Sequence, residues 1–195
     1  QHVVIRRSKN ITLDYLNLTG SSKDVADADN AMDIDSGEGA GNTEGLGTNW
    51  NSVPLGGIVD ANINIKNCLV ESYGFTCLHV AAYDGITFEN NEFKAMYDFV
   101  NSTKKDNTAN WGASAKFLNS KNIAFIRNNF TGQHATSILL QGSQKVLIYD
   151  NVFWHDNGVR SSANTVAIIR LISYGSCAGD NPLQNIGIYY NTMFL

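Results

Sequence analysis

The chain has 195 residues, of which 43% are apolar, and a formal net charge of -4. This length suits one domain with a substantial core. The mild acidity argues against a nucleic-acid-binding protein, which normally carries a basic stripe, and no apolar run is long enough to span a bilayer.

One short pattern recurs from the N-terminus to the C-terminus: Asn, apolar, any, apolar, any, any, Asn, any, Phe. It begins at residues 10, 62, 85, 122, 145 and 185, with some substitutions. The intervals from 62 to 85 and from 122 to 145 are equal, and the others are longer, as if loops had been added. Apolar residues alternating with other residues predict a strand with one buried face. A fixed repeat of such strands predicts a solenoid.

A further strand is expected before each repeat, and a short turn joins the two. These strands are expected at residues 3–6, 30–35, 78–81, 115–118, 138–141 and 167–170. Each coil then has three strands, the third starting after the second Asn of the pattern. Aromatic side chains should stack inside, coil upon coil, at Phe93, Phe130 and Phe153.

The recurring asparagines predict a second stack. Asn91, Asn128, Asn151 and Asn191 fall at the same sharp turn of successive coils. An asparagine there can adopt the left-handed conformation and hydrogen-bond the equivalent amide of the next coil. We therefore expect an asparagine ladder.

Three strands per coil, an asparagine turn and an internal aromatic stack together resemble the pectate-lyase-like superfamily. The resemblance implies an all-β fold, a right-handed single-stranded parallel β-helix of about six coils. We expect one β-helix domain over residues 1–195, forming part of a longer solenoid. Open ends would allow end-to-end stacking with more solenoid or with another chain. Residues 36–58 are expected to be a long Gly-rich loop insertion.

The resemblance also implies that a polysaccharide binds on the outward face of the first strand of each coil. The outward residues expected there include Asp33 and Asp35, then His79, then Lys116. Stacked strands would place Asp33, His79 and Lys116 in one column spanning about 10 Å. In the last two coils, Ile168 is expected beside Leu139, and Arg170 beside Gln141.

Two reactions suit these residues. In β-elimination on a uronate polysaccharide, Lys116 is the base and Arg170 or His79 neutralises the carboxylate. Calcium would be held by Asp33, Asp35 and Asp29. In inverting glycoside hydrolysis, Asp33 and Asp35 are instead the acid and the base, about 6.5–7 Å apart as residues i and i+2 of a strand.

Further residues are candidates for substrate binding. Gln141 and Arg6 belong to the outward face, whereas Trp50 and His155 are expected in loops that reach it. Trp111 and Trp154, also expected in loops, could stack on sugar rings, although local packing is an equal alternative.

A non-enzymatic protein is the main alternative, because extracellular stems, adhesins and filaments use the same fold. The sequence contains neither the Gly-His-Gly of polygalacturonase-like hydrolases nor the Arg-x-Pro-x-x-Arg of the main pectate lyase family. An extracellular or cell-surface glycoprotein is expected, with acceptor sites at Asn10, Asn17, Asn101 and Asn129. Cys68 and Cys77 could form a disulfide or remain buried thiols.

Overall fold

A computed structural model provides the structure of the chain. It describes residues 3–20, 31–35, 55–72, 76–95, 113–132, 136–155, 167–172 and 182–194. Within these ranges the chain forms eighteen strands and no helix. No described segment is therefore a helix able to cross a membrane.

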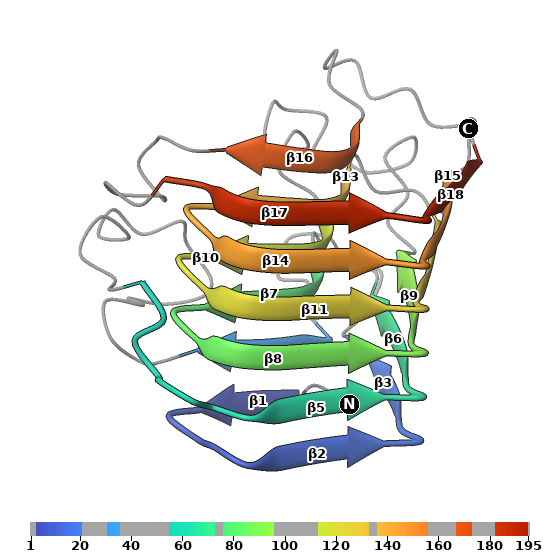
Figure 1. The fold of residues 1–195 in the computed structure, drawn as a ribbon. Coiled ribbons are helices and arrows are strands. Elements are labelled where there is room, and N and C mark those ends of the chain that lie inside the picture. Colours follow the sequence, from blue (N-terminus) through green and yellow to red (C-terminus); the bar gives the residue numbers. More distant parts are fainter. Residues whose placement is uncertain are drawn as a thin grey trace, which may run out of the picture.

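The strands form three parallel sheets of six strands each (Figure 1). Sheet A contains β1 (Val3–Arg6), β4 (Met32–Asp35), β7 (Thr76–Ala81), β10 (Ala113–Leu118), β13 (Thr136–Gln141) and β16 (Ala167–Ile172). Sheet B contains β2 (Ile11–Asp14), β5 (Ile63–Lys66), β8 (Asp84–Glu89), β11 (Lys121–Ile126), β14 (Gln144–Tyr149) and β17 (Gln184–Tyr189). Sheet C contains β3 (Asn17–Thr19), β6 (Leu69–Ser72), β9 (Glu92–Ala95), β12 (Asn129–Gly132), β15 (Val152–His155) and β18 (Thr192–Phe194).

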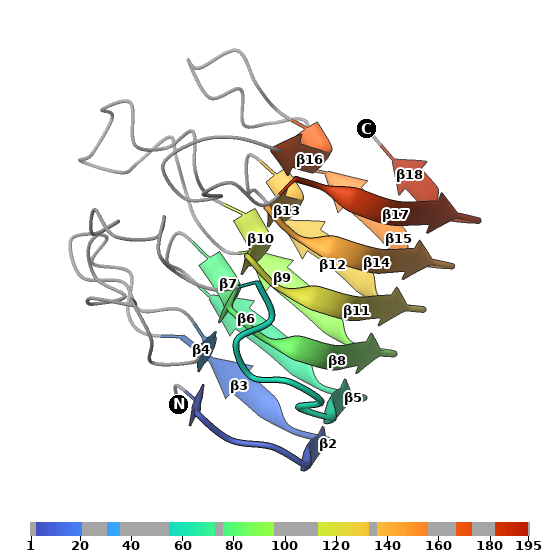
Figure 2. The same ribbon diagram turned by 60° about the vertical axis from the view of Figure 1, so that its left-hand side comes forward.

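The chain visits sheets A, B and C in turn, and every strand pairs with its equivalent in the next coil. This makes six coils of three strands, from coil 1 (β1–β3) to coil 6 (β16–β18). Figure 2 shows the three sheets as the walls of one stack, in which the coils wind in the right-handed sense seen in Figure 1. The predicted parallel β-helix is confirmed.

Aromatic side chains fill the interior in two stacks. Along sheet C, Phe130 stacks on Phe93 and on Phe153, with ring centroids 4.8 and 4.9 Å apart. Along sheet B, Phe88 and Phe125 stack at 5.0 Å. These spacings match the distance between neighbouring strands, because each phenylalanine is in register with the next. The predicted Phe93–Phe130–Phe153 stack is confirmed.

The predicted asparagine ladder is also present. The Oδ1 atom of Asn128 accepts hydrogen bonds from the backbone N and the Nδ2 of Asn91, at 2.9 and 3.0 Å. Asn151 does the same for Asn128, and Asn191 for Asn151. Each Nδ2 also donates to a backbone carbonyl of the preceding coil, as Asn128 does to Phe88 at 3.0 Å. The buried amides are thereby paired.

The predicted backbone conformation of the ladder residues is wrong. The left-handed conformation belongs to the preceding residue in each coil: Asn90, Arg127, Asp150 and Tyr190, with φ between 54° and 56°. The reason is geometric. The left-handed residue turns the chain outward, and the asparagine that follows points inward, where its amide meets the next coil.

Cys68 and Cys77 are both buried free thiols, so the disulfide alternative is wrong. Cys68 occupies the ladder position of coil 2, because its backbone N donates to Asn91 Oδ1 at 2.9 Å. Its Sγ donates to the Lys66 carbonyl oxygen at 3.1 Å. The ladder therefore runs over coils 3 to 6 and ends on a cysteine.

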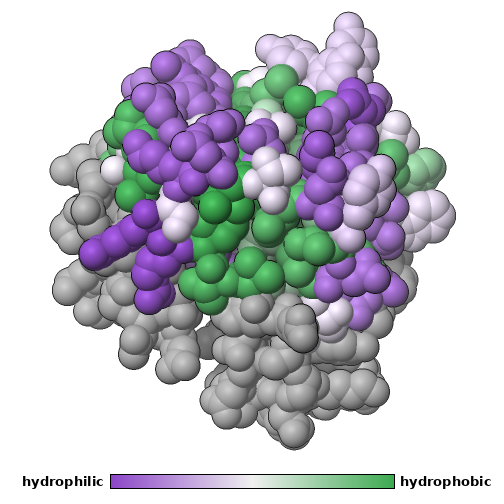
Figure 3. Space-filling view, turned by 90° about the horizontal axis from the view of Figure 1, so that it is seen from below, coloured by the Kyte–Doolittle hydropathy of each residue, from purple (hydrophilic) through white to green (hydrophobic). Residues whose placement is uncertain are grey.

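Apolar side chains also appear at the two ends of the described stack. Viewed along the axis from the coil 1 end, they gather in the middle of the molecule (Figure 3). At the other end, Ile188 and Met193 align with the core residues Ile148 and Phe153 but are exposed. End-to-end stacking remains a prediction. Most of the expected Gly-rich insertion, residues 36–54, lies outside the described residues.

Candidate functional site

The predicted column on sheet A is formed by strands in direct register. Asp33 of β4 pairs with His79 of β7, and His79 pairs with Lys116 of β10. Lys116 pairs with Leu139 of β13, which pairs with Arg170 of β16. We call these five residues the sheet A column. Because neighbouring strands lie about 4.8 Å apart, Lys116 and Arg170 are separated by roughly 10 Å along the axis.

The expected position of Arg170 is wrong, since Arg170 and not Ile168 lies beside Leu139. The strand is shifted by two residues relative to the expectation, so the inward and outward faces stay the same. The observed register places Ile169 and Leu171 over Ile138 and Leu140. In the expected register the smaller Ala167 would lie over Ile138, with less apolar contact. A second cation thus joins the predicted column.

Three of the four charged or titratable residues of the column are well shielded from solvent, and Arg170 is partly buried. Asp33 is 3% exposed, and His79 and Lys116 are each 6% exposed. On the same outward face, Ala81, Leu118 and Leu139 are also buried. Burying a charge is unfavourable unless the charge is paired. His79 Nδ1 lies 3.5 Å from Asp33 Oδ1, which is ion-pair distance but longer than a normal hydrogen bond.

A second outward column runs beside the first along the whole of sheet A. It contains Arg6, which is exposed, and further along Leu118 paired with Gln141. Gln141 is 3% exposed, and its Oε1 atom has no hydrogen-bond partner. The site therefore offers a buried acceptor one strand from the Lys116 strand, within a mostly apolar wall.

The described side chains do not include the full set of predicted calcium ligands. Asp29 and the side chain of Asp35 lie outside the described residues. The predicted substrate-binding residue Trp50 also lies outside them. Within the described part of the chain, no three His, Cys, Asp or Glu side chains group closely enough to hold a metal ion. Of the predicted calcium ligands, only Asp33 is placed, and it faces His79. Calcium binding remains a prediction.

His155 and Trp154 were expected in loops, and this is wrong. Both belong to β15 of sheet C. The pattern residue Phe153 lies at the centre of that strand and not at its end, so the two following residues continue it. The side chain of His155 lies outside the described residues, whereas that of Trp154 points outward and is exposed.

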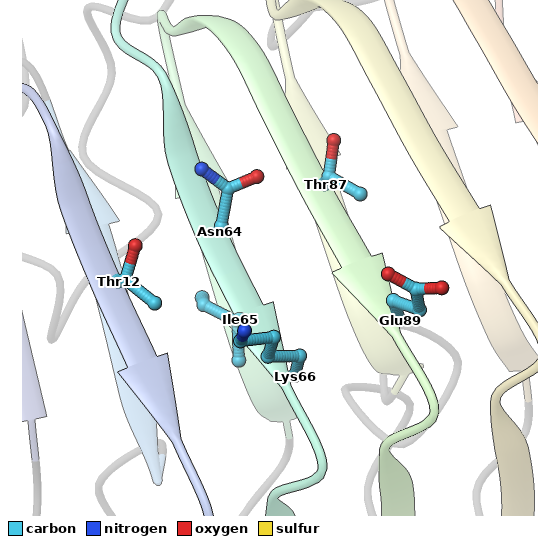
Figure 4. A pocket seen from close by; sticks show the side chains of 6 residues that line it. All are labelled: Thr12, Asn64, Ile65, Lys66, Thr87 and Glu89. Carbon is cyan, nitrogen blue, oxygen red and sulfur yellow. The ribbon is translucent and has the colours of Figure 1, made fainter.

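A shallow depression on the outer face of sheet B was not predicted (Figure 4). It is lined by Thr12, Asn64, Ile65, Lys66, Thr87 and Glu89. Lys66 Nζ lies 3.3 Å from Asp14 Oδ2, and Glu89 pairs with Arg127. A hydrogen bond from Asn67, aided by the nearby Lys66 ammonium, lowers the pKa of Asp14. Paired surface charges of this kind indicate an ordinary solvated face.

No protein-family model matches the chain, and neither a curated protein nor a solved structure shows a significant match to it. Function must therefore be inferred from the residues themselves. Their arrangement brings a carboxylate, an imidazole, an amine and a guanidinium into one column on one sheet.

Proposed function

We propose that the protein is a lyase that cleaves an acidic, uronate-containing polysaccharide by β-elimination. The supporting observation is the register of the sheet A column, in which Lys116 lies next to His79 and two strands from Arg170. A single base flanked by two groups able to carry positive charge suits removal of a proton beside a carboxylate.

Lys116 acts as the base, a role for which its amine must be unprotonated. It takes the proton from the carbon next to the uronate carboxylate. The electron pair of that C–H bond forms a carbon–carbon double bond, and the bond from the β-carbon to the glycosidic oxygen breaks. The leaving oxygen takes a proton to become a hydroxyl group.

The neighbouring groups stabilise the charge that develops on the carboxylate. Arg170 can pair with a carboxylate through two parallel hydrogen bonds. Asp33 Oδ1 faces His79 Nδ1 at 3.5 Å, beyond hydrogen-bond distance, so it would act on the imidazole through its charge. If calcium binds at Asp33, Asp35 and Asp29, it would neutralise the same carboxylate. Gln141, with its buried Oε1, is proposed to accept a hydrogen bond from a sugar hydroxyl.

The proposed location is extracellular or at the cell surface. The acceptor asparagines Asn10, Asn17 and Asn129 are all exposed, as glycosylation requires, and Asn101 lies outside the described residues. This supports the polysaccharide partner, since such polymers are found outside cells or on their surfaces.

A non-enzymatic extracellular β-helix is the second candidate. The observation in its favour is the burial of Asp33, His79 and Lys116, because a structural ion-pair cluster would also be shielded from solvent. Inverting hydrolysis by Asp33 and Asp35 is the third.

One assay separates the three candidates. The protein is incubated with a panel of uronate polysaccharides, with calcium or with a chelator, and ultraviolet absorbance and reducing ends are followed together. The lyase gives new reducing ends and the absorbance of an unsaturated uronate product in equal amounts. Reducing ends without absorbance indicate the hydrolase. Neither signal on any polymer would contradict an enzyme acting on this class.

A further inference from the structure

The outer faces of sheets B and C change character from one end of the solenoid to the other. In the early coils, equivalent outward positions carry charges that pair across strands: Asp14 with Lys66 on sheet B, and Glu71 with Lys94 on sheet C, both at 3.3 Å. Following the same positions into coils 5 and 6 leads to aromatic residues. These are Tyr149 and Tyr189 on sheet B and Trp154 and Phe194 on sheet C.

The aromatic residues lie on both sides of the corner between the two sheets, in coils 5 and 6. Tyr190 lies at that corner and is 80% exposed, and its ring contacts that of Tyr149 edge to face at 5.6 Å. Around the corner, Trp154 and Phe194 lie 5.0 Å apart. Tyr189 and Trp154 are each 56% exposed. We call Tyr149, Tyr189, Tyr190, Trp154 and Phe194 the aromatic ridge.

A glycine makes room for one ring of the ridge. Gly187 lies two residues before Tyr189 on the same outward face of β17. A Cβ atom at Gly187 would lie 2.5 Å from Cε2 of Tyr189, so the ring edge occupies the space that a side chain would fill. The backbone of Gly187 has no positive φ and does not itself require glycine. The glycine therefore permits the Tyr189 ring to lie where it does.

Most outward strand residues around the ridge are uncharged, but two exposed charged residues adjoin it: Lys145 of β14, and Asp150, the coil 5 counterpart of Tyr190 at the corner. The outward positions of β14, β15, β17 and β18 with described side chains are Gln144, Leu147, Tyr149, Val152, Trp154, Gln184, Gly187, Tyr189, Thr192 and Phe194. They combine aromatic faces with neutral hydrogen-bonding groups. The ridge is two coils high, roughly 10 Å along the axis. A patch of that height is small for a stable protein interface, which buries about 800 Å² per partner.

We propose that the aromatic ridge is a binding site for a neutral glycan. One face of a pyranose ring carries C–H groups with partial positive charge, and these stack on the negative face of an aromatic ring. The exposed Asp150 carboxylate at the corner would repel a sugar carboxylate and can accept hydrogen bonds from sugar hydroxyls, so a sugar without carboxylates suits the ridge. This ligand differs from the acidic substrate proposed for sheet A, and the two sites lie on different sheets.

The test is native gel electrophoresis with a polysaccharide in the gel: hydroxyethyl cellulose, xylan, mixed-linkage β-glucan or starch, with polygalacturonate as the acidic comparison. At least one neutral polymer is expected to retard the wild-type chain. Tyr189→Ala and Trp154→Ala should each weaken retardation about tenfold. Gly187→Ala keeps every ring but displaces Tyr189, so it should also weaken retardation.

Two variants serve as controls. Glu71→Gln/Lys94→Gln removes the paired charges from equivalent positions of sheet C and should be retarded like wild type. Lys116→Met should keep neutral-glycan retardation even if it lacks lyase activity, which separates this proposal from the preceding one. The proposal is overturned if no neutral polymer retards the wild type, or if the three ridge variants bind like wild type. Self-association that the ridge variants abolish, without glycan retardation, would instead assign the ridge to a protein interface.

Discussion

The ladder asparagines show how one side chain can satisfy several buried groups. Asn128 accepts from two nitrogens of Asn91 and donates to the Phe88 carbonyl, while its own backbone N donates to Asn151. Neither aspartate nor alanine offers an acceptor and a donor in this geometry. The sequence predicted these residues because their spacing matched the repeat. The sequence did not reveal that the left-handed backbone conformation of the turn belongs to the residue before each ladder asparagine.

Replacing Asn128 with alanine should therefore be costly. The variant leaves two buried donors of Asn91 and one buried carbonyl without their partner, and we expect the free energy of unfolding to fall by about 3 kcal/mol. Asn129→Ala is the matched control. This neighbour is exposed on β12, so its loss should change stability by less than about 0.5 kcal/mol. Urea denaturation measures both, and similar values for the two variants would refute the ladder's contribution.

Cys68 gives stability a pH dependence on the alkaline side. Burial raises the pKa of its thiol above the ordinary value of 9.0. The unfolded chain therefore releases the thiol proton at lower pH than the folded chain, and stability falls as the pH rises above 9.0. Below that pH the thiol is protonated in both states.

Wild type and Cys68→Ala are compared by urea denaturation between neutral and strongly alkaline pH. The stability advantage of the wild type should shrink as the pH rises through and beyond the ordinary thiol pKa. An advantage that stays constant over this range would show that the folded environment does not disfavour the Cys68 thiolate.

At the level of the strand, the alternation of apolar residues identified faces correctly but left one register undetermined. A shift of two residues preserves which side chains point inward, so the pattern alone could not distinguish Ile168 from Arg170 beside Leu139. Packing decides between them, because the observed register places larger residues over the interior of β13. This correction brings Arg170 into the column with Lys116.

Engineered disulfides test that register directly. Leu139→Cys combined with Arg170→Cys places thiols on directly paired residues of adjacent strands, within the Cα separation that a disulfide tolerates. Leu139→Cys combined with Ile168→Cys adds an offset of two residues, which with the strand spacing puts the two Cα atoms about 8 Å apart, beyond the limit of about 7 Å for a disulfide. After mild oxidation, peptide mass spectrometry should find the cross-link only in the first pair. A cross-link only in the second would restore the register expected from the pattern.

For the whole molecule, the sequence predicted the solenoid well because the fold is a repetition. Each coil supplies the same inward residues, so Phe93, Phe130 and Phe153 reinforced one another as signals. The functional surfaces break the repeat and gave weaker signals. The sheet A column was predicted from a few charged residues, whereas the aromatic ridge became visible only when register aligned Tyr149 with Tyr189 and Trp154 with Phe194.

The most direct test of the central proposal is the formation of unsaturated uronate product by wild type, Lys116→Met and Lys94→Met. Lys94 is a matched control, since it is a lysine on a neighbouring sheet that pairs with Glu71 at the surface. Wild type and Lys94→Met should form the product at similar rates, and Lys116→Met should lose at least about two orders of magnitude, the contribution typical of a general base. Wild-type activity in Lys116→Met would contradict the account.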